Sequence, residues 1–328
     1  MEFQEDIDRK LAKVSLAEID LCDPYYQISY GTVPATLRDS LRAVGVINPP
    51  TLQRKHDGRW RIVAGFRRCA FCQEEGAKVI MAWSVKDTVP ELSLFIWAVC
   101  DNLGTRQLNS VECATVLAKL HAQFCVPKEE LAGRYMPLLG LNGSIELLER
   151  YRSLAALEEP MRQWLAEERL SQEAALRLVE MAPEDARALF AVIVVLRLGK
   201  NYQRELVRLA EDVARREGLN IRELVARPEL QAVLQEESLS PPHKAEQVLG
   251  WLRERRFPRL ALARRRYAEL VRQLSLPANV RLSPPPYFEG AEWQCQLHFS
   301  SQEELRQMAE RLQEIARGGE LEQLLLLP

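Results

Sequence analysis

The residues with the clearest chemical potential are Gly65, Arg67 and Arg68. A predicted strand over residues 60–64 runs into the glycine, and the two arginines fall at the start of the next predicted helix. A helix N-terminus exposes free N–H groups and carries partial positive charge. Glycine lets the backbone approach an anion closely, and guanidinium groups offer paired donors to phosphate oxygens. The pattern predicts an anion site, most simply a phosphate site; the alternative is a surface arginine pair beside a tight turn.

A second basic group lies near the C-terminus. Residues 251–281 contain nine Arg and two Glu, whereas the whole chain has a net charge of −2. Arg264, Arg265 and Arg266 are adjacent, so on a helix they point about 100° apart and spread a band of charge. Such a band suits sequence-independent contact with DNA phosphates. The alternative is a solvated helix face.

The composition limits the class of protein. The 328 residues are 47% hydrophobic and 27% charged, as in ordinary soluble globular proteins. The longest apolar run, residues 188–196, is too short to span a bilayer, and the acidic N-terminus is not a secretory signal. We therefore expect a cytoplasmic protein with no membrane contact. The seven cysteines are scattered, and the lone pair Cys69 and Cys72 has no second pair to complete a zinc site, so we expect packed, reduced thiols.

The elements that must position these residues change character along the chain. The first part is mixed α and β, with a short strand over residues 14–19, a helix over 36–44, strands over 51–53, 60–64 and 79–84, and a helix from 65 to 75. Helical periodicity then dominates to about residue 250. The last part predicts a helix over 259–274, strands over 279–283 and 292–299, and a helix over 301–316 opened by a capping box.

This order predicts an α+β chain of several domains. We expect a polar leader over residues 1–13, a small mixed α/β domain over 14–100, an all-helical domain over 101–250, and a basic helix with a helix–strand–strand–helix unit over 251–328. A unit of about 60 residues buries little core by itself, so we expect it to pair with a second copy.

Several motifs, in this order, resemble the ParB family of chromosome and plasmid partition proteins, which includes ParB/RepB-like members. They are Ser40 to Gly45-Val-Ile-Asn48-Pro49, Gly65-Phe-Arg-Arg68, Asp101-Asn102-Leu103 leading into Leu108–Ala114, Lys128–Ala132, Arg152–Leu157, Leu170-Ser171, and residues 280–305. The resemblance implies a ParB/sulfiredoxin-like N-terminal domain, a helix-turn-helix domain and a C-terminal dimerisation unit. Each motif is weak alone; their common order makes the resemblance.

The resemblance also implies a function. ParB-family proteins bind CTP with Mg²⁺, close as dimers around DNA, reopen by slow hydrolysis, and work with a ParA-type ATPase on the nucleoid. Transferred by position, the nucleotide-binding residues are Gly45, Asn48, Pro49, Gly65, Arg67, Arg68 and Asn102, and the metal ligands are Asp101 and Asn102. Oxygen ligands of this kind suit magnesium.

The chain departs from the family pattern at several of these positions. Phe66 replaces a glutamate, Asn48 replaces a glutamine, and Thr105 stands where an arginine is expected, with Arg106 one residue later. Whether CTP is bound or hydrolysed therefore stays open, and no catalytic residue is assigned. No constellation of carboxylates and histidine supports a nuclease.

The DNA-reading part has mixed signals. The expected recognition helix begins at Ser144 and contains Arg150 and Arg152, which favour DNA, and Glu146 and Glu149, which oppose phosphates. The preceding turn, over residues 135–143, is longer than usual. Two hypotheses follow: a CTP-dependent DNA clamp or adaptor in partition, and a ParB-like regulator or scaffold without a working nucleotide switch.

Overall fold

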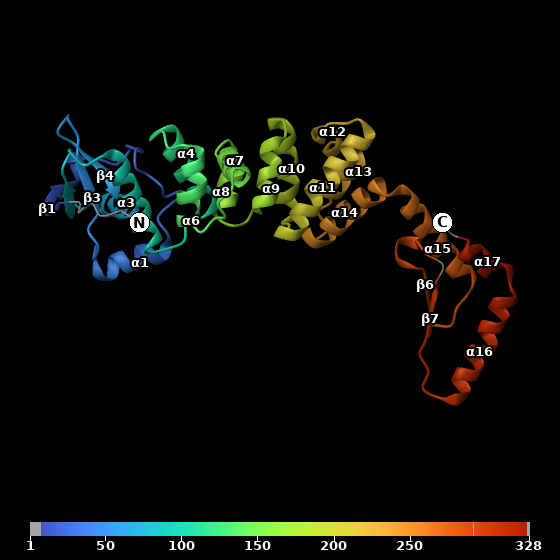
Figure 1. Cartoon of the computed structure of the whole chain (residues 1–328). Coiled ribbons are helices and arrows are strands. Elements are labelled where there is room, and N and C mark those ends of the chain that lie inside the picture. The colour runs from blue at the N-terminus through green and yellow to red at the C-terminus, as the bar shows by residue number, and fades with distance from the viewer. Residues whose placement is uncertain (1–7, 291, 327–328) are drawn as a thin grey trace. The chain divides into compact units, whose positions relative to one another are not determined.

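The computed structural model describes residues 8–290 and 292–326 (Figure 1). The chain divides into two compact units. The first comprises Met1–Ile193 with Leu198–Arg204, and the second comprises Val194–Arg197 with Glu205–Pro328. The division falls within α10 (Pro183–Leu196) and α11 (Lys200–Glu217).

The first unit contains a mixed five-stranded sheet. Its strand order is β1-β5-β3-β4-β2, where the strands are β1 (Arg9–Ser15), β2 (Ile19–Asp20), β3 (Thr51–Arg54), β4 (Trp60–Ala64) and β5 (Val79–Val85). The pairs β1·β5 and β3·β4 are antiparallel, and β3·β5 and β2·β4 are parallel. The strands predicted at residues 51–53, 60–64 and 79–84 are therefore confirmed.

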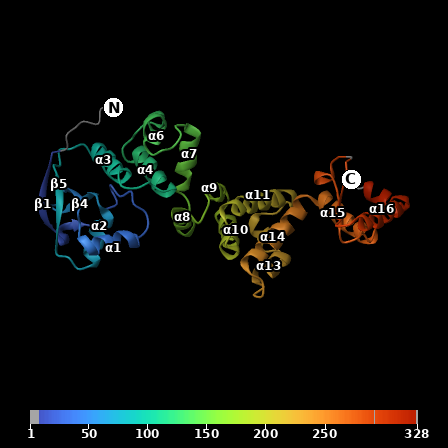
Figure 2. The ribbon, with the colours of Figure 1, turned by 90° about the horizontal axis from the view of Figure 1, so that it is seen from below.

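Helices cover the sheet. Apolar side chains of α1 (Ala35–Val44) and α2 (Phe66–Glu74), among them Leu41 and Phe71, form one core cluster with Leu52 and Ile62 of the strands. The helix α3 (Glu91–Leu103) contacts β4, and Figure 2 shows it apart from α1 and α2. The helix α2 begins directly after β4, so the end of that strand fixes where Arg67 and Arg68 start.

The sheet begins earlier than the sequence pattern indicates. The strand β1 starts at Arg9, within the residues expected to be a polar leader, and it ends at Ser15, where a strand over residues 14–19 is expected. Residues 16–18 form a 3₁₀ turn. The reason is that β1 is an edge strand with exposed Arg9 and Lys10, and charged residues on an edge strand resemble an unstructured polar segment. Residues 1–7 of the expected leader lie outside the described residues.

The rest of the first unit is helical. It contains α4 (Ser110–Ala122), α5 (Lys128–Glu130), a π-helical segment (Leu131–Tyr135), α6 (Met136–Leu138), α7 (Ile145–Leu154), α8 (Glu159–Ala166), α9 (Gln172–Glu180) and most of α10. The segments from α5 to α6 are continuous, and α7 packs against α4, α9 and this continuous helix. The order is a helix, a turn and a second helix, as expected.

The turn before α7 is shorter than the sequence predicts. The first helix continues to Leu138, so the turn starts only at Leu139. Pro137 donates no backbone hydrogen bond, and it lies directly after the π-helical segment, where the Met136 N–H donates to the Leu131 carbonyl oxygen. The turn also passes close to the helix: a Cβ on Gly143 would lie 2.4 Å from the carbonyl oxygen of Ala132. Only glycine permits this approach.

The second unit contains a helical part and a C-terminal part. The helical part comprises α11 from Glu205 onward, α12 (Ile221–Val225), α13 (Pro228–Gln235) and α14 (Pro241–Arg256), and the C-terminal part comprises α15 (Pro258–Gln273), β6 (Val280–Ser283), β7 (Gln294–Leu297), α16 (Gln302–Arg317) and α17 (Gly319–Leu325). The strands β6 and β7 form an antiparallel pair. The predicted order of helix, strand, strand and helix is present.

The C-terminal part has a small core of its own. Leu270 of α15 and Leu274, the residue directly after this helix, pack with Ile315 of α16 and Leu324 of α17. Other apolar side chains of this part stay exposed, including Leu262 at 67% and Leu326 at 76%. The hydroxyl of Ser301 accepts a hydrogen bond from the backbone N–H of Glu304, so this side of the expected capping box is present.

The expected domain boundaries do not coincide with breaks between elements. Residue 100 lies inside α3, and residue 250 lies inside α14.

Within the described part of the chain, no helix is long and apolar enough to cross a membrane, and no group of three or more His, Cys, Asp or Glu could hold a metal. Cys69 and Cys72 are buried on α2, where burial raises the pKa of Cys69 to about 12, as expected for packed thiols.

Candidate functional site

Gly65 has the backbone geometry that the anion-site hypothesis requires. It is the N-cap of α2 with φ 97° and ψ 24°, a left-handed conformation. A Cβ at this position would lie 2.7 Å from Cβ and 3.0 Å from Cα of Pro50. The backbone therefore passes through a space that no other residue type fits. The turn presents the first N–H groups of α2 next to Arg67 and Arg68.

Arg67 lies half-buried beneath the loop that carries Tyr30. Its Nη2 donates to the Tyr30 carbonyl oxygen at 3.0 Å and lies 3.5 Å from Oε1 of Glu112. Its Nε is buried and has no hydrogen-bond partner among the described residues. Burial, and then the positive charge of Arg106, lower the pKa of Arg67. This guanidinium is therefore a cation with one unsatisfied donor in a poorly hydrated place.

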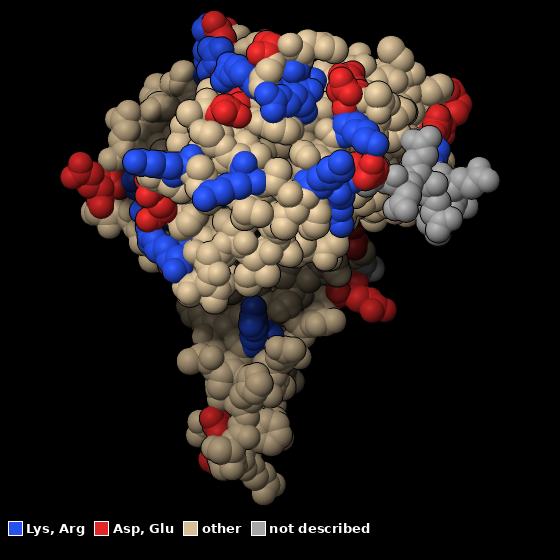
Figure 3. Space-filling view, turned by 90° about the vertical axis from the view of Figure 1, so that its left-hand side faces the viewer, with Lys and Arg blue, Asp and Glu red and all other residues tan. Residues whose placement is uncertain are grey.

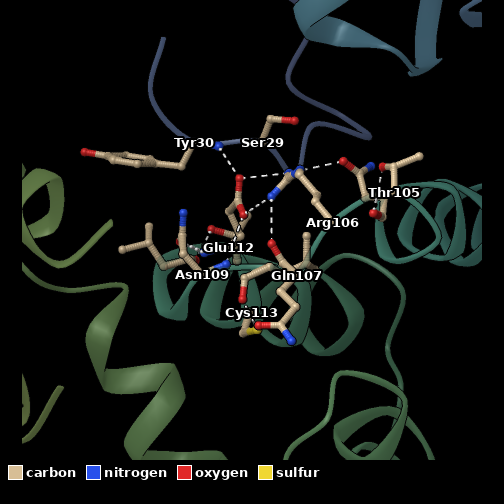
Figure 4. Close-up of polar contacts among 12 residues, drawn as sticks. Ser29, Tyr30, Thr105, Arg106, Gln107, Asn109, Glu112 and Cys113 are labelled. Atoms are coloured by element: carbon tan, nitrogen blue, oxygen red, sulfur yellow. Dashed lines mark hydrogen bonds and ion pairs between the residues drawn. The ribbon is translucent and has the colours of Figure 1, made fainter. Parts of the chain in front are cut away.

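Glu112 is the centre of the surrounding network (Figure 4). Its side chain is fully buried at 0% exposure. It forms a capping box with Asn109 at the start of α4, and its Oε1 also accepts from the Tyr30 backbone N–H at 3.1 Å. One carboxylate thus fixes a helix N-terminus and the Tyr30 loop at the same time.

Arg106 holds the same carboxylate from the other side. Its Nη1 contacts Oε2 of Glu112 at 2.5 Å, and its Nη2 contacts Oε1 at 3.0 Å. The sequence pattern indicates Arg106 only as a displaced arginine, with no role of its own. Its spacing of six residues before Glu112, across a helix start, was the available signal. Arg67 and Arg106 together face one buried carboxylate, so this cluster has an excess of one positive charge.

Arg68 points to different partners from Arg67. Its Nη1 donates to the Asn48 carbonyl oxygen, and its Nη2 lies 3.4 Å from Oδ2 of Asp101. The guanidinium groups of Arg67 and Arg68 therefore do not converge on one common partner in this structure. Arg68 does bring together two of the predicted segments, the one around Asn48 and the one around Asp101.

Three other predicted nucleotide residues, Gly45, Asn48 and Pro49, lie in the segment between α1 and β3. Gly45 ends α1 with φ 74° and an open surrounding, and Pro49 is half-buried just before β3. The Asn48 backbone carbonyl is held by Arg68, while its side chain is on an exposed residue. Arg68 therefore contacts this segment through the Asn48 carbonyl oxygen.

The predicted metal pair does not form a metal site here. Oδ1 of Asn102 accepts from Nη2 of Arg106 at 3.1 Å, and its Nδ2 donates to the Ala98 carbonyl oxygen at 2.9 Å. An amide oxygen that faces a guanidinium is not arranged as a ligand for Mg²⁺. Asp101 remains as one carboxylate, and it is paired with Arg68. These residues do not fit a magnesium site built by the protein.

An open groove of about 640 Å³ lies elsewhere on the first unit. It is bounded by the hairpin of β3 and β4 and by the segment before α3, and its lining includes Lys55, Arg61 and Glu91. None of the predicted nucleotide residues lines it. Lys55 and Arg61 are held by carboxylates, among them Asp23, so the groove is a charge-balanced surface. Figure 3 shows the face of the structure that lies at the left in Figure 1, where basic side chains are interspersed with acidic ones.

The Tyr30 loop connects the sheet to the helices of the first unit. The Tyr30 hydroxyl donates to Oε1 of Glu159 on α8 at 2.5 Å. Two side chains hold the nearby Tyr25 carbonyl oxygen: Nζ of Lys119, on α4, donates to it at 3.0 Å, and Nε2 of Gln123, directly after α4, donates at 3.3 Å. Burial raises the pKa of Tyr30 to about 12, with the Glu159 hydrogen bond as the next cause. This loop therefore contacts α2, α4 and α8.

On α7, the structure separates the predicted DNA residues. Ser144 caps the helix, and its hydroxyl accepts from the Leu147 N–H at 3.0 Å. Arg152 pairs with Glu149 at 3.1 Å, and Glu149 also pairs with Lys128 at 2.7 Å. Arg150 is exposed, and no ion pair is found for it within residues 8–290 and 292–326. Arg150 is therefore the freest cation of this helix.

The arginine-rich segment also divides into two groups. On α14, the side chains of Arg253, Arg255 and Arg256 pair with Glu205, Glu217 and Asp212. These arginines fasten helices of the second unit together. On α15, the predicted Arg264, Arg265 and Arg266 are all exposed, and Arg265 pairs with Glu254. Only the α15 group keeps cations at the surface as the sequence predicts.

Comparison with known proteins identifies relatives. No protein-family model matches the chain. It is 28% identical over 218 residues to the probable chromosome-partitioning protein ParB of Neisseria meningitidis, covering 66% of this chain and 65% of that protein. It is 35% identical over 98 residues to the chromosome-partitioning protein ParB of Myxococcus xanthus, covering 30% and 32% of the two chains. The chain thus spans about 65% of the length of the Neisseria relative.

Solved structures were also found. Truncated ParB from Caulobacter crescentus, complexed to its centromeric parS site, covers 60% of this chain and 98% of that one, at 20% identity and a TM-score of 0.35. The same protein complexed with CTP-γ-S covers 56% and 99%, at 21% identity and a TM-score of 0.25. Both TM-scores lie below 0.5, so the similarity of this chain to ParB proteins is taken from the sequence relatives and not from these structures.

Proposed function

Because this chain is similar to chromosome-partitioning proteins named ParB, we propose that it is a DNA-binding protein of the partition type whose first unit binds CTP at Arg67. The observation that carries the nucleotide part is the buried Nε of Arg67, which lacks a hydrogen-bond partner among the described residues, beside Arg106, whose guanidinium pairs with the same carboxylate, that of Glu112. A half-buried cluster with one excess positive charge is stabilised by an incoming anion. A nucleotide phosphate supplies that charge and several acceptor oxygens.

In this proposal each residue has a definite task. The turn at Gly65 admits phosphate to the first N–H groups of α2, and Arg67 donates to its oxygens. Arg68 keeps the Asn48 and Asp101 segments together at the rim of the same surface. Mg²⁺ is implied by the family resemblance, and none of these tasks depends on it.

A titration of the full chain tests nucleotide binding. CTP, UTP, ATP and GTP are titrated calorimetrically with and without Mg²⁺, against wild type and Arg67→Ala. We expect CTP to bind most tightly and Arg67→Ala to weaken it at least about tenfold, since a charge-assisted hydrogen bond contributes roughly 1.5–3 kcal/mol. Arg42→Ala is the matched control, because Arg42 lies on α1 and pairs with Glu75 at 2.8 Å. Equal affinities for wild type and Arg67→Ala contradict the proposal.

The DNA part of the proposal rests on α7 and α15. Arg150 on α7 is available for a base edge or a phosphate, and Arg264 and Arg266 are available for phosphates on any sequence. A gel-shift series with Arg150→Ala, on DNA selected from a random pool by the wild type, tests this. We expect the variant to lose preference for the selected DNA. A wild type that selects no sequence contradicts specific readout.

We further propose a homodimer formed by the C-terminal part, acting on the nucleoid with a ParA-type ATPase. Exposed apolar side chains, including Leu262, Leu325 and Leu326, support self-association. Sedimentation of a chain truncated before Arg259 tests the dimer without nucleotide. A monomer is the expected result, and a truncated chain that still forms a dimer contradicts an interface in the C-terminal part.

A second candidate function is a ParB-like regulator or scaffold without a nucleotide switch. The observation that favours it is that Arg67 and Arg68 contact different partners and that Phe66, an apolar residue, lies between Gly65 and them. It predicts DNA binding that is indifferent to every nucleotide. The same titration, repeated with DNA present, separates the two candidates.

A further inference from the structure

The two guanidinium groups around Glu112 are bound very unequally. Arg106 contacts both carboxylate oxygens, at 2.5 and 3.0 Å. Arg67 approaches the same carboxylate only at 3.5 Å, and its best hydrogen bond goes to a neutral carbonyl, that of Tyr30. Bidentate contacts between arginine and carboxylate are the strong form of this ion pair. Arg106 is therefore the main partner of Glu112, and most of the positive charge of Arg67 stays unneutralised.

Within the described part of the chain, the Glu112 carboxylate forms ion pairs with these two cations alone. Its remaining partners are the N–H groups of Tyr30 and Asn109, which are neutral, and its side chain is 0% exposed. Without Arg106, Glu112 would be a buried charge next to one guanidinium. Pairing with Arg67 would then be strongly favoured, because an unpaired buried charge is costly.

We propose that Arg106 is a positioning residue of the anion site: by holding Glu112, it keeps the guanidinium of Arg67 available for phosphate. The inference rests on the proposed nucleotide function and adds the residue that keeps the site cationic. Arg106 acts through Glu112, and it also holds Oδ1 of Asn102 at 3.1 Å, which fixes its plane. It needs no contact with the nucleotide.

Two other roles for Arg106 make different predictions. If Arg106 contacts phosphate itself, or attracts it over a distance, then its removal weakens binding whether or not Glu112 is charged. If it acts through Glu112, its removal matters only while the carboxylate is present. A double-mutant cycle between positions 106 and 112 distinguishes these cases.

The experiment titrates CTP and inorganic tripolyphosphate into the full chain and into Arg106→Gln, Glu112→Gln and the double variant. The Tyr30 and Asn109 N–H groups donate to different oxygens of Glu112, so glutamine at position 112 keeps an acceptor for one of them and removes the negative charge. We expect Arg106→Gln to weaken CTP binding about tenfold, Glu112→Gln to leave it equal or tighter, and Arg106→Gln in the Glu112→Gln background to change it less than about twofold. The tenfold step equals about 1.4 kcal/mol.

Arg106→Lys gives a second arm that survives if Glu112→Gln fails to fold. Lysine keeps the charge but cannot make the bidentate contact, so we expect a loss of several-fold that persists at high salt, because a buried pair is little screened. An equal effect of Arg106→Gln in both backgrounds, or wild-type affinity in Arg106→Lys, overturns the inference. A wild type that binds neither CTP nor tripolyphosphate instead overturns the proposed nucleotide function.

Discussion

Replacing Gly65 by alanine should damage the start of α2 more than the loss of conformational freedom alone. At φ 97° an L-residue is strained, which costs about 1–2 kcal/mol. The new Cβ would also meet Pro50 at 2.7 and 3.0 Å. Pro50 cannot retreat easily, because its ring is rigid and its carbonyl oxygen accepts from the Trp83 N–H at 2.8 Å in the sheet. Overpacking of this kind adds about 1–3 kcal/mol.

The matched control is Gly58→Ala. Gly58 lies in the turn between β3 and β4 with φ 82°, and nothing lies within 4 Å of a Cβ placed there. It therefore carries the backbone strain without the collision. We expect Gly65→Ala to destabilise the local structure by about 1–3 kcal/mol more than Gly58→Ala, which is the overpacking contribution alone.

Native-state hydrogen exchange of the full chain, read by mass spectrometry on peptides covering β4 and α2, measures this difference. An extra 1.4 kcal/mol corresponds to about tenfold faster exchange where opening limits it. Equal exchange in Gly65→Ala and Gly58→Ala would refute the reasoning, because the proximity of Pro50 would then have no energetic consequence. The same variants titrated with CTP report whether the turn is also needed for anion binding.

Three further predictions concern charges. Replacing residues 264–266 by glutamine should reduce the slope of log affinity against log salt concentration for nonspecific DNA by about 2, because Arg264 and Arg266 each account for about 0.9. Arg253→Gln is the control, because it breaks an ion pair with Glu205 and should leave this slope unchanged. Burial lowers the pKa of Lys119 from its ordinary 10.5 to about 8. Between these two pH values the unfolded chain keeps a proton on Lys119 that the folded chain has lost, so the free energy of unfolding should rise with pH from about 8 to 10.5. Denaturant titrations measure this rise, and Lys119→Met should abolish it. Tyr30→Phe removes the hydrogen bond to Glu159, and amides of α8 should exchange about fivefold faster, an effect near 1 kcal/mol; unchanged exchange there would show that this contact does not hold α8.

The sequence determined the local elements well where a strong local signal exists. The strand over residues 60–64, the helix after Gly65 and the helix ended by Gly45 were all predictable, because glycine and hydrophobic periodicity act within a few residues. The edge strand β1 was missed because its exposed charges resemble a polar tail, and its partner β5 lies about 70 residues away. The long turn predicted over residues 135–143 was wrong, because the helix continues through a π-helical segment to Leu138 even though Pro137 is a local signal against a helix.

The sequence placed Gly65, Arg67 and Arg68 together, and their order with other motifs pointed to the ParB family. Only the tertiary structure decided what each arginine contacts. Arg67 turns towards Glu112 and Tyr30, Arg68 towards Asn48 and Asp101, and Arg106 takes the carboxylate of Glu112. Neighbours on a helix point about 100° apart, so adjacent residues meet different surroundings, and these come from segments 20 to 45 residues distant. The charge that each guanidinium keeps depends on those distant partners, and a local pattern cannot contain them.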